Sequence, residues 1–202
     1  MLAHFSKDEN MIAVFRNGGD IHAKTMELTG TKRKEAKGIN FGLIYGRGAR
    51  SLARTLNTTE AQAKDYIAKF FAGYPRIRYF EQRVQQKALQ EGYVEMITGR
   101  KRRFYGIKDK RQINVIQRRA VNTKIQGSSA DLIKIAMIKL DRILGSFDAH
   151  QLIQVHDEIV IEVPQEKVEE VKLLVKETME GALKLRVPLE VGIKEGNYWV
   201  KS

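Results

Sequence analysis

The stretch Arg33-Lys-Glu-Ala-Lys37-Gly-Ile-Asn-Phe41-Gly-Leu-Ile-Tyr45-Gly46 has the most distinctive spacing in the sequence. On a helix that turns about 100° per residue, side chains four positions apart wind slowly along one side. Here such positions hold two cations followed by two aromatic rings, namely Arg33, Lys37, Phe41 and Tyr45. The spacing therefore predicts a helix with a cationic and aromatic stripe.

The opposite side of this predicted helix is apolar. Ala36, Ile39 and Leu43 fall at about 300°, 240° and 280° when Arg33 is set at 0°. An apolar side of this kind packs against a core. Gly46 then stands where a helix C-terminus favours a residue that tolerates left-handed dihedrals. We expect a helix buried on its apolar side and ended by this glycine.

The stripe matches the shape of a nucleoside triphosphate. Two cations about 6 Å apart along the axis suit a polyphosphate, and an aromatic face one turn further on suits a sugar or base. The alternative is an ordinary amphipathic helix with a solvated Lys/Arg edge. The stripe by itself leaves both interpretations open.

Composition narrows the class of protein. The chain has 202 residues, of which 43% are hydrophobic and 30% charged, as in globular proteins with one domain or two joined subdomains. The net charge of +12 favours a polyanionic partner, either nucleic acid or an acidic membrane surface. The absence of cysteine excludes disulfides, thiol catalysis and Cys-based zinc sites.

No apolar run approaches the ~18 residues of a membrane span. We therefore expect a soluble protein without membrane attachment. Its expected location is the cytoplasm of a bacterium or of a phage-infected cell, and an organelle stays open.

We predict mainly helices in the first half of the chain. We expect helices over Met1–Phe15, over a short segment capped by Asp20, over a segment capped by Asn57 with Glu60 at its third position, and over Arg76–Glu91. His22 lies in the short segment, where a lone histidine is usually structural. A hairpin follows, with strands over Tyr93–Ile97 and Arg102–Tyr105.

Basic residues gather in and after this hairpin. Arg100-Lys-Arg-Arg103 stands beside two aromatic residues, and Arg118 and Arg119 follow. Such clusters suit phosphate contacts that weaken with salt. The alternatives are a solvated basic surface or a nuclear import signal.

The next segment is predicted as two helices. Ile113–Lys124 is helical by period, with Asn122 and Gln126 four apart; Ser128 and Ser129 then cap a second, long helix that ends at Gly145. Amides donate and accept, so this pair suits base edges in a minor groove. The alternative is a cap or an ordinary surface pair.

A second hairpin is predicted near the end. Its apolar, β-branched arms, Leu152–Val155 and Glu158–Val163, predict a core sheet with His156 and Asp157 at the tip. Carboxylates there suit Mg²⁺, although a plain acidic turn explains them too. A helix over Glu166–Leu183 and a strand over Leu189–Ile193 follow.

The sequence resembles family A DNA polymerases of the bacterial polymerase I type. Arg-x3-Lys-x3-Phe-x3-Tyr-Gly is similar to motif B, the nucleotide-binding helix of the fingers. Gly19–His22, Asn122-x3-Gln126-Gly127 and Gln154–Glu158 stand in the family's order around it. The resemblance extends from about Leu2 to Trp199.

The resemblance implies a role for each matching residue. His22, Arg33 and Lys37 would hold the triphosphate, and Phe41 and Tyr45 would pack on its sugar and base. Asp157 would bind Mg²⁺ as the catalytic ligand, with support from His156 and Glu158. Residues expected to contact primer–template DNA are Tyr45, Gly46, Arg100, Arg102, Arg118, Asn122 and Gln126.

The resemblance also implies the fold. It is an α+β, partial right-hand fold, with mainly helical fingers and an antiparallel-sheet palm. Residues 1–22 would form a palm segment, 23–115 the fingers, and 116–202 the palm with the motif C hairpin. The thumb and the motif A strand are absent from the sequence.

The missing motif A, Asp-Tyr-Ser-x-Ile-Glu-x-Arg, carries the second metal-binding aspartate of the family. One aspartate does not hold two metal ions. We therefore expect the isolated chain to be inactive, and to need an upstream polypeptide that carries motif A and the thumb. The expected substrates are deoxynucleoside triphosphates and primer–template DNA.

Two other functions stay open. A non-catalytic nucleic-acid-binding module derived from a polymerase would explain the positive charge and the missing motif. A single-subunit RNA polymerase shares the palm and a related helix, although Phe41 and the Glu after His156-Asp157 favour the DNA enzymes.

Overall fold

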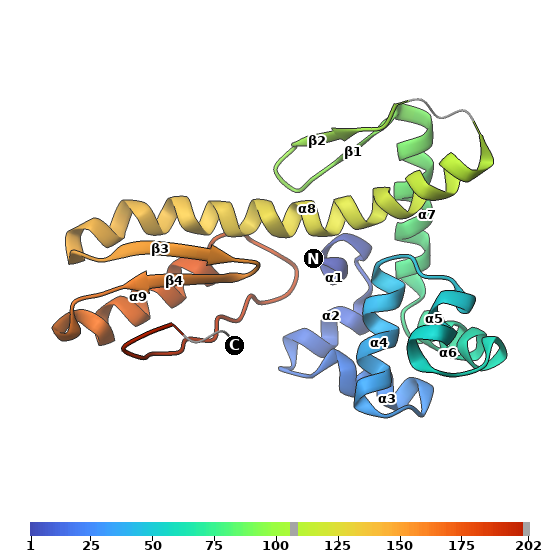
Figure 1. Cartoon of the computed structure of the whole chain (residues 1–202), viewed down its shortest axis with the longest axis horizontal. Coiled ribbons are helices and arrows are strands. Elements are labelled where there is room, and N and C mark those ends of the chain that lie inside the picture. Colours follow the sequence, from blue (N-terminus) through green and yellow to red (C-terminus); the bar gives the residue numbers. More distant parts are fainter. Residues whose placement is uncertain (106–108, 200–202) are drawn as a thin grey trace. The chain divides into compact units, whose positions relative to one another are not determined.

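The computed structural model describes residues 1–105 and 109–199 (Figure 1). The chain divides after Ser128 into two compact units. The first unit contains α1 (Leu2–Ser6), α2 (Glu9–Arg16), α3 (Ile21–Thr29), α4 (Arg33–Ile44), α5 (Ala49–Leu56), α6 (Glu60–Gly73), α7 (Pro75–Glu91), β1 (Tyr93–Glu95) and β2 (Lys101–Arg103). Helix α8 (Lys110–Leu144) belongs to both units. The second unit adds η1 (Gly145–Phe147), β3 (His150–Val155), β4 (Glu158–Glu162), η2 (Gln165–Lys167) and α9 (Val168–Glu180).

The expected single helix over Met1–Phe15 is wrong, because the chain breaks at Lys7, where φ is 55°. Asp8 then caps α2, with its Oδ1 accepting from the Met11 amide at 2.9 Å. Its Oδ2 accepts from the Arg76 amide, also at 2.9 Å, in the first turn of α7. This carboxylate is buried, and it accepts from backbone donors at the starts of two helices, where the helix itself supplies no acceptor.

Helix α4 confirms the prediction made from its periodicity. Ala36, Ile39 and Leu43 are buried, and the helix packs against α3 and α5. It ends at Ile44, and Gly46 has the left-handed φ of 68° that the sequence predicts. The cap of α3 is also as expected, since Asp20 accepts from the His22 amide at 2.8 Å.

The cap of α6 differs from the expectation. Thr59, not Asn57, is its N-cap, and Thr59 Oγ1 accepts from the Gln62 amide at 3.2 Å. Asn57 instead ends α5 with φ 51°. Asn tolerates this left-handed conformation better than most residues, so it serves the end of one helix rather than the start of the next.

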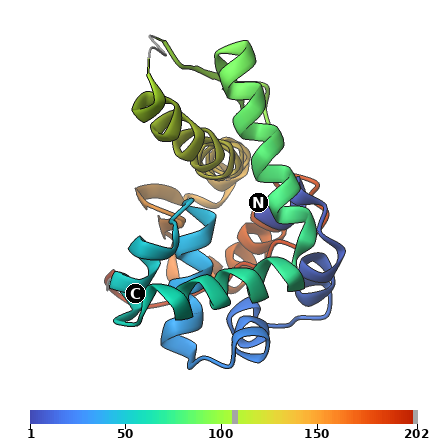
Figure 2. The ribbon, with the colours of Figure 1, turned by 90° about the vertical axis from the view of Figure 1, so that its right-hand side faces the viewer.

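Helix α7 follows the predicted bounds, Arg76–Glu91, to within one residue. Figures 1 and 2 show α7 running from α6 to the first hairpin, and α7 contacts both. Gly92, with φ 71°, ends it. Strands β1 and β2 pair with Tyr93 opposite Arg103, and each is three residues long, shorter than expected.

The expected helix boundary at Gly127–Ser128 is wrong, because α8 continues through it. Ser128 is not a cap: its hydroxyl donates to the Lys124 carbonyl at 2.6 Å and accepts from the Ile97 amide at 3.0 Å. A Cβ on Gly127 would lie 2.8 Å from Cγ of Met96. The glycine therefore permits close packing against the hairpin rather than ending a helix.

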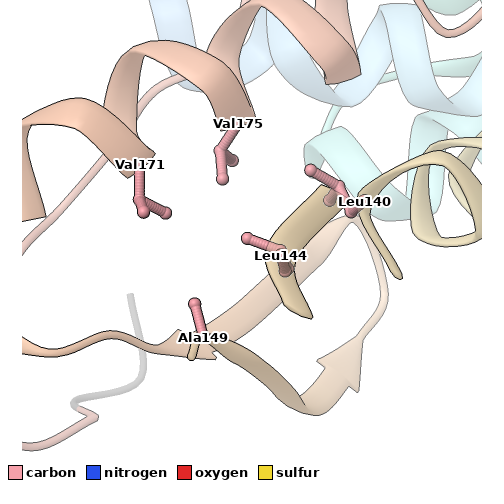
Figure 3. Close-up of a cluster of buried hydrophobic side chains, with 5 residues drawn as sticks. All are labelled: Leu140, Leu144, Ala149, Val171 and Val175. Carbon is pink, nitrogen blue, oxygen red and sulfur yellow. The ribbon is translucent and has the colours of Figure 1, made fainter. Parts of the chain in front are cut away.

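The second unit is built around the far end of α8. Leu140, Leu144 and Ala149 form a buried cluster with Val171 and Val175 of α9 (Figure 3). Ile159, Ile161 and Val163 pack against this cluster. The predicted helix over Glu166–Leu183 is present as η2 followed by the shorter α9.

Strands β3 and β4 form the expected hairpin, with Val155 opposite Glu158 and an irregularity between Gln151 and Ile153. The expected core sheet is confirmed only for β4 and Val163, which pack on the core cluster, since in β3 Leu152 is 56% and Ile153 46% exposed. Within the described residues each strand pairs only with the other. One side of the hairpin packs on α8 and α9, and other apolar side chains of β3 are exposed to solvent.

The expected last strand over Leu189–Ile193 is also wrong, since this segment has no regular structure. Its Val191 amide donates to the Glu180 carboxylate at 3.0 Å instead of to a neighbouring strand. No helix in residues 1–105 and 109–199 is both long and apolar enough to cross a bilayer. The expected division into residues 1–22, 23–115 and 116–202 stays a prediction.

Candidate functional site

The predicted stripe lies on the exposed side of α4. Phe41 is 42% and Tyr45 37% exposed, and their rings stack with centroids 6.3 Å apart and planes 11° from parallel. Lys37 Nζ lies 5.8 Å from the Phe41 ring centroid, within range of a cation–π contact. The two aromatic rings and the lysine therefore form one continuous surface.

Arg33, at the start of the stripe, is paired. Its Nη1 donates to Oδ2 of Asp20, while Oδ1 of the same carboxylate caps α3. The Arg33 guanidinium and the His22 amide hold the pKa of Asp20 below its usual value. Sequence reasoning assigned Asp20 only the cap, because a separation of 13 residues gives no local signal for the pair.

His22 is held beside the stripe by a residue that sequence reasoning missed. Asn40 Nδ2 lies 2.8 Å from His22 Nδ1, and Asn40 Oδ1 lies 2.9 Å from the Thr25 hydroxyl. Asn40 is buried on the apolar side of α4, and a polar residue at such a position was the available signal.

The charge state of His22 follows from its surroundings. Burial lowers the pKa of the imidazole, Asp20 raises it, and the positive charges of Arg33 and Lys37 lower it further. A neutral ring that accepts at Nδ1 from Asn40 carries its proton on Nε2. His22 therefore offers one N–H donor near two cations without adding a third positive charge.

Helix α8 approaches the end of α4. A Cβ on Gly46 would lie 3.3 Å from Cγ of Arg118 and 3.8 Å from its Cα. Arg118, Asn122 and Gln126 stand four apart and so share one side of α8. The structure thus brings Gly46 beside Arg118, the first of the predicted DNA-contacting residues of α8.

Asn122 has an unusual environment within this row. Its Oδ1 is buried and has no hydrogen-bond partner among the described residues. A buried acceptor without a partner costs free energy unless a ligand or water supplies a donor. Arg118 and Gln126, by contrast, are exposed.

Two of the predicted DNA-contacting arginines also have structural partners. Arg100 Nη2 donates to the Gly127 carbonyl at 3.2 Å, and Arg102 Nη1 donates to the Thr123 hydroxyl at 2.8 Å. Both bonds join the β1–β2 hairpin to α8. Each guanidinium has further N–H donors for a phosphate.

The tip of the β3–β4 hairpin holds the predicted metal ligand. Asp157 and His156 are exposed, and His156 has a left-handed φ of 56° that turns the chain. Trp199 Nε1 donates to Glu158 Oε1 at 2.6 Å, a contact that sequence reasoning missed.

The described residues contain no group of three or more His, Asp or Glu side chains placed to hold a metal ion. Asp157 therefore supplies a single carboxylate. Mg²⁺ is commonly held by one or two carboxylates together with waters and substrate phosphates. The residues present fit one ligand of such a site and do not fit a complete two-ion site.

Comparison with known proteins gives a consistent result. Residues 1–201 match the family described as DNA polymerase family A. DNA polymerase I of Lactococcus lactis subsp. lactis is 41% identical over 217 residues, covering 100% of this chain and 25% of that protein. The thermostable DNA polymerase I of Thermus filiformis is 41% identical over 213 residues, covering 100% of this chain and 26% of that protein.

A solved structure agrees with these relatives. The POL domain of Pol1 from M. smegmatis, in complex with DNA primer-template and dNTP, matches with a TM-score of 0.89 and 32% identity. The match covers 94% of this chain and 36% of that one. The chain spans about a quarter of the length of the curated relatives it matches.

Proposed function

Because this chain belongs to DNA polymerase family A, we propose that it takes part in template-directed DNA synthesis. In this reaction the primer 3′-OH attacks the α-phosphorus of a deoxynucleoside triphosphate. A new P–O bond forms, the bond between the α- and β-phosphates breaks, the hydroxyl proton is lost and pyrophosphate leaves. The observation that carries the proposal is the exposed stripe of α4, with cations at one end and stacked rings at the other.

The stripe would bind the incoming nucleotide. Arg33 and Lys37 would hold the triphosphate and offset the charge that develops during transfer. His22 would add a neutral N–H donor, supported by its bond to Asn40. Phe41 and Tyr45 would pack on the sugar and base, where their stacked faces are accessible.

The row on α8 would position the DNA. Arg118 is exposed and would contact a phosphate. Asn122 and Gln126 would contact base edges, and the unpaired Oδ1 of Asn122 supports this role because it needs a donor. Arg100 and Arg102 would contact the backbone of primer–template DNA from the first hairpin.

Family A polymerases use divalent metal ions, and Asp157 would be one ligand for Mg²⁺ in this chain. Bound Mg²⁺ would neutralise phosphate charge and lower the pKa of the attacking hydroxyl. His156 would shape the turn that presents Asp157. Glu158 would support the site, oriented by Trp199.

A segment outside these 202 residues would complete the site. It would supply the second metal-binding carboxylate and the thumb, whether it belongs to the same polypeptide or to another. Among the described residues no third strand pairs with the β3–β4 hairpin, and this supports the proposal because a further strand could pair with its open edge. The cytoplasmic location stays a prediction.

Primer extension with Mg²⁺ tests the proposed function. The chain is assayed alone and together with the polypeptide encoded directly upstream of it. We expect extension only with the upstream segment, and loss of at least a hundredfold in rate for Asp157→Asn. Asp141→Asn, at an exposed position of α8, is the matched control and should retain the rate.

The same assay separates the alternative functions. If no upstream segment restores extension while DNA binding persists, a non-catalytic nucleic-acid-binding module is the better account. A strong preference for ribonucleotides over deoxyribonucleotides would instead favour an RNA polymerase.

A further inference from the structure

We infer that Asp20 sets the affinity of the α4 stripe for a triphosphate by competing with it for Arg33. The inference rests on the proposed nucleotide-binding role of the stripe. It assigns a function to a residue that is neither a cation nor a metal ligand.

The ion pair occupies the cation that stands first in the stripe. The Arg33 side chain is 64% exposed and the Asp20 side chain 37% exposed, so a ligand in solution can reach both. Lys37 differs, since no carboxylate in residues 1–105 and 109–199 forms an ion pair with it. The two cations are thus unequal: Lys37 is available at once, whereas Arg33 already holds an anion.

A triphosphate that binds here meets a negative charge. It must displace Oδ2 of Asp20 from Arg33 or share the guanidinium with it, which is possible because a guanidinium has five N–H donors. In either case the carboxylate stays close to a polyanion, and like charges at such a distance repel. Asp20 therefore lowers affinity even when it does not block the site.

Asp20 is not free to move away, because its other oxygen caps α3. Leaving the site would cost that helix its side-chain cap. The lowered pKa of Asp20 keeps the carboxylate ionised at neutral pH. The competing charge is therefore fixed in place and permanent under physiological conditions.

The two tasks of Asp20 can be separated by substitution. Asn and Ser cap helices about as well as Asp but carry no charge. Asp20→Asn and Asp20→Ser therefore keep α3 intact and remove only the competitor. Glu27→Gln is the matched control, because Glu27 is an exposed carboxylate on the same helix, paired with Lys24 at 2.6 Å, and its loss changes the net charge equally.

Calorimetric titration of the 202-residue chain with inorganic tripolyphosphate and with dATP, in magnesium-free low-salt buffer, measures the effect. We expect Asp20→Asn and Asp20→Ser to lower the Kd for both probes about two- to fivefold relative to Glu27→Gln, the range for one exposed charge pair. Arg33→Ala should weaken binding. Unchanged far-UV circular dichroism would verify the fold of each variant.

The possible results separate the inference from the proposed function. If the wild-type chain binds the probes, Arg33→Ala weakens binding, and Asp20→Asn equals Glu27→Gln, the competition is overturned while the nucleotide site stands. Weaker binding by Asp20→Asn also overturns it, because Asp20 would then orient Arg33. If the wild-type chain binds neither probe, the proposed site fails and the competition fails with it.

Discussion

Asp8 and Asp20 share one hydrogen-bonding arrangement but differ in burial. Each carboxylate caps a helix with Oδ1 and serves a second partner with Oδ2. Asp8 is buried, and its second partner is the backbone of α7, so the residue is committed to the fold. Asp20 is exposed and its second partner is a side chain, so the same chemistry can be exchanged for a ligand.

Glu81, on α7, links the stability of the fold to pH. Burial raises its pKa to about 7, and Arg78 only partly opposes this. A raised folded-state pKa means that its stabilising contribution is complete below the unfolded value of 4.5 and is lost as pH rises through about 7.

Glu81→Gln should therefore remove a pH-dependent cost. We expect wild type and variant to have similar free energies of unfolding near pH 4.5, with the variant more stable by about 1–3 kcal/mol at pH 8, an estimate discounted for partial exposure. Urea denaturation at both pH values measures this. Glu177→Gln, at an exposed position of α9, is the control, and a difference as large for it would contradict the explanation.

At the scale of elements, the sequence predicted those features that depend on the spacing of neighbouring residues. The two sides of α4 follow from its period, and Gly46 stands with left-handed φ just after the helix, as expected. Predictions failed where contacts between residues far apart in the sequence determine how an element continues. Ser128 bonds to Ile97 across 31 residues, and Gly127 makes room for Met96, so α8 continues where its composition suggested a stop.

The candidate site shows the same division. The exposed stripe and the hairpin that carries Asp157 were predicted from spacing and from the family resemblance. The partners of those residues were not, because Asp20, Asn40 and Trp199 reach them only through tertiary structure.

A substitution at Gly46 tests how closely the end of α4 packs against α8. An alanine there must adopt φ near 68° and place its Cβ 3.3 Å from Arg118 Cγ. We expect Gly46→Ala to lower the free energy of unfolding by about 1–2 kcal/mol, from left-handed strain together with crowding. Urea denaturation measures the loss.

Gly192→Ala is the control for this substitution. Gly192 lies in irregular structure, outside the left-handed region, and an added Cβ would meet nothing within 4 Å. Its substitution should change stability by less than about 0.5 kcal/mol. Equal losses at the two positions would show that the approach to Arg118 is unimportant.

At the scale of the whole molecule, the net charge of +12 predicts salt-sensitive binding to primer–template DNA. Arg118→Ala should weaken binding and reduce the magnitude of the slope of log K against log salt by about 0.9, the value for one phosphate contact on a duplex. Fluorescence anisotropy between about 50 and 200 mM salt measures the slope.

Arg142→Ala provides the comparison, because Arg142 is an exposed arginine in the last turn of the same helix. It removes the same charge away from the row that begins at Arg118. A slope change as large as that of Arg118→Ala would show that only overall charge matters.

The open β3–β4 hairpin has a consequence for how this chain persists in solution. Two strands that pair only with each other within the described residues, and that expose Leu152 and Ile153, offer a template for strands of other copies. Self-association is then second order in concentration, whereas pairing with the proposed further strand would not depend on concentration if that strand belonged to the same polypeptide. Self-association of a separately produced chain should therefore decrease on dilution.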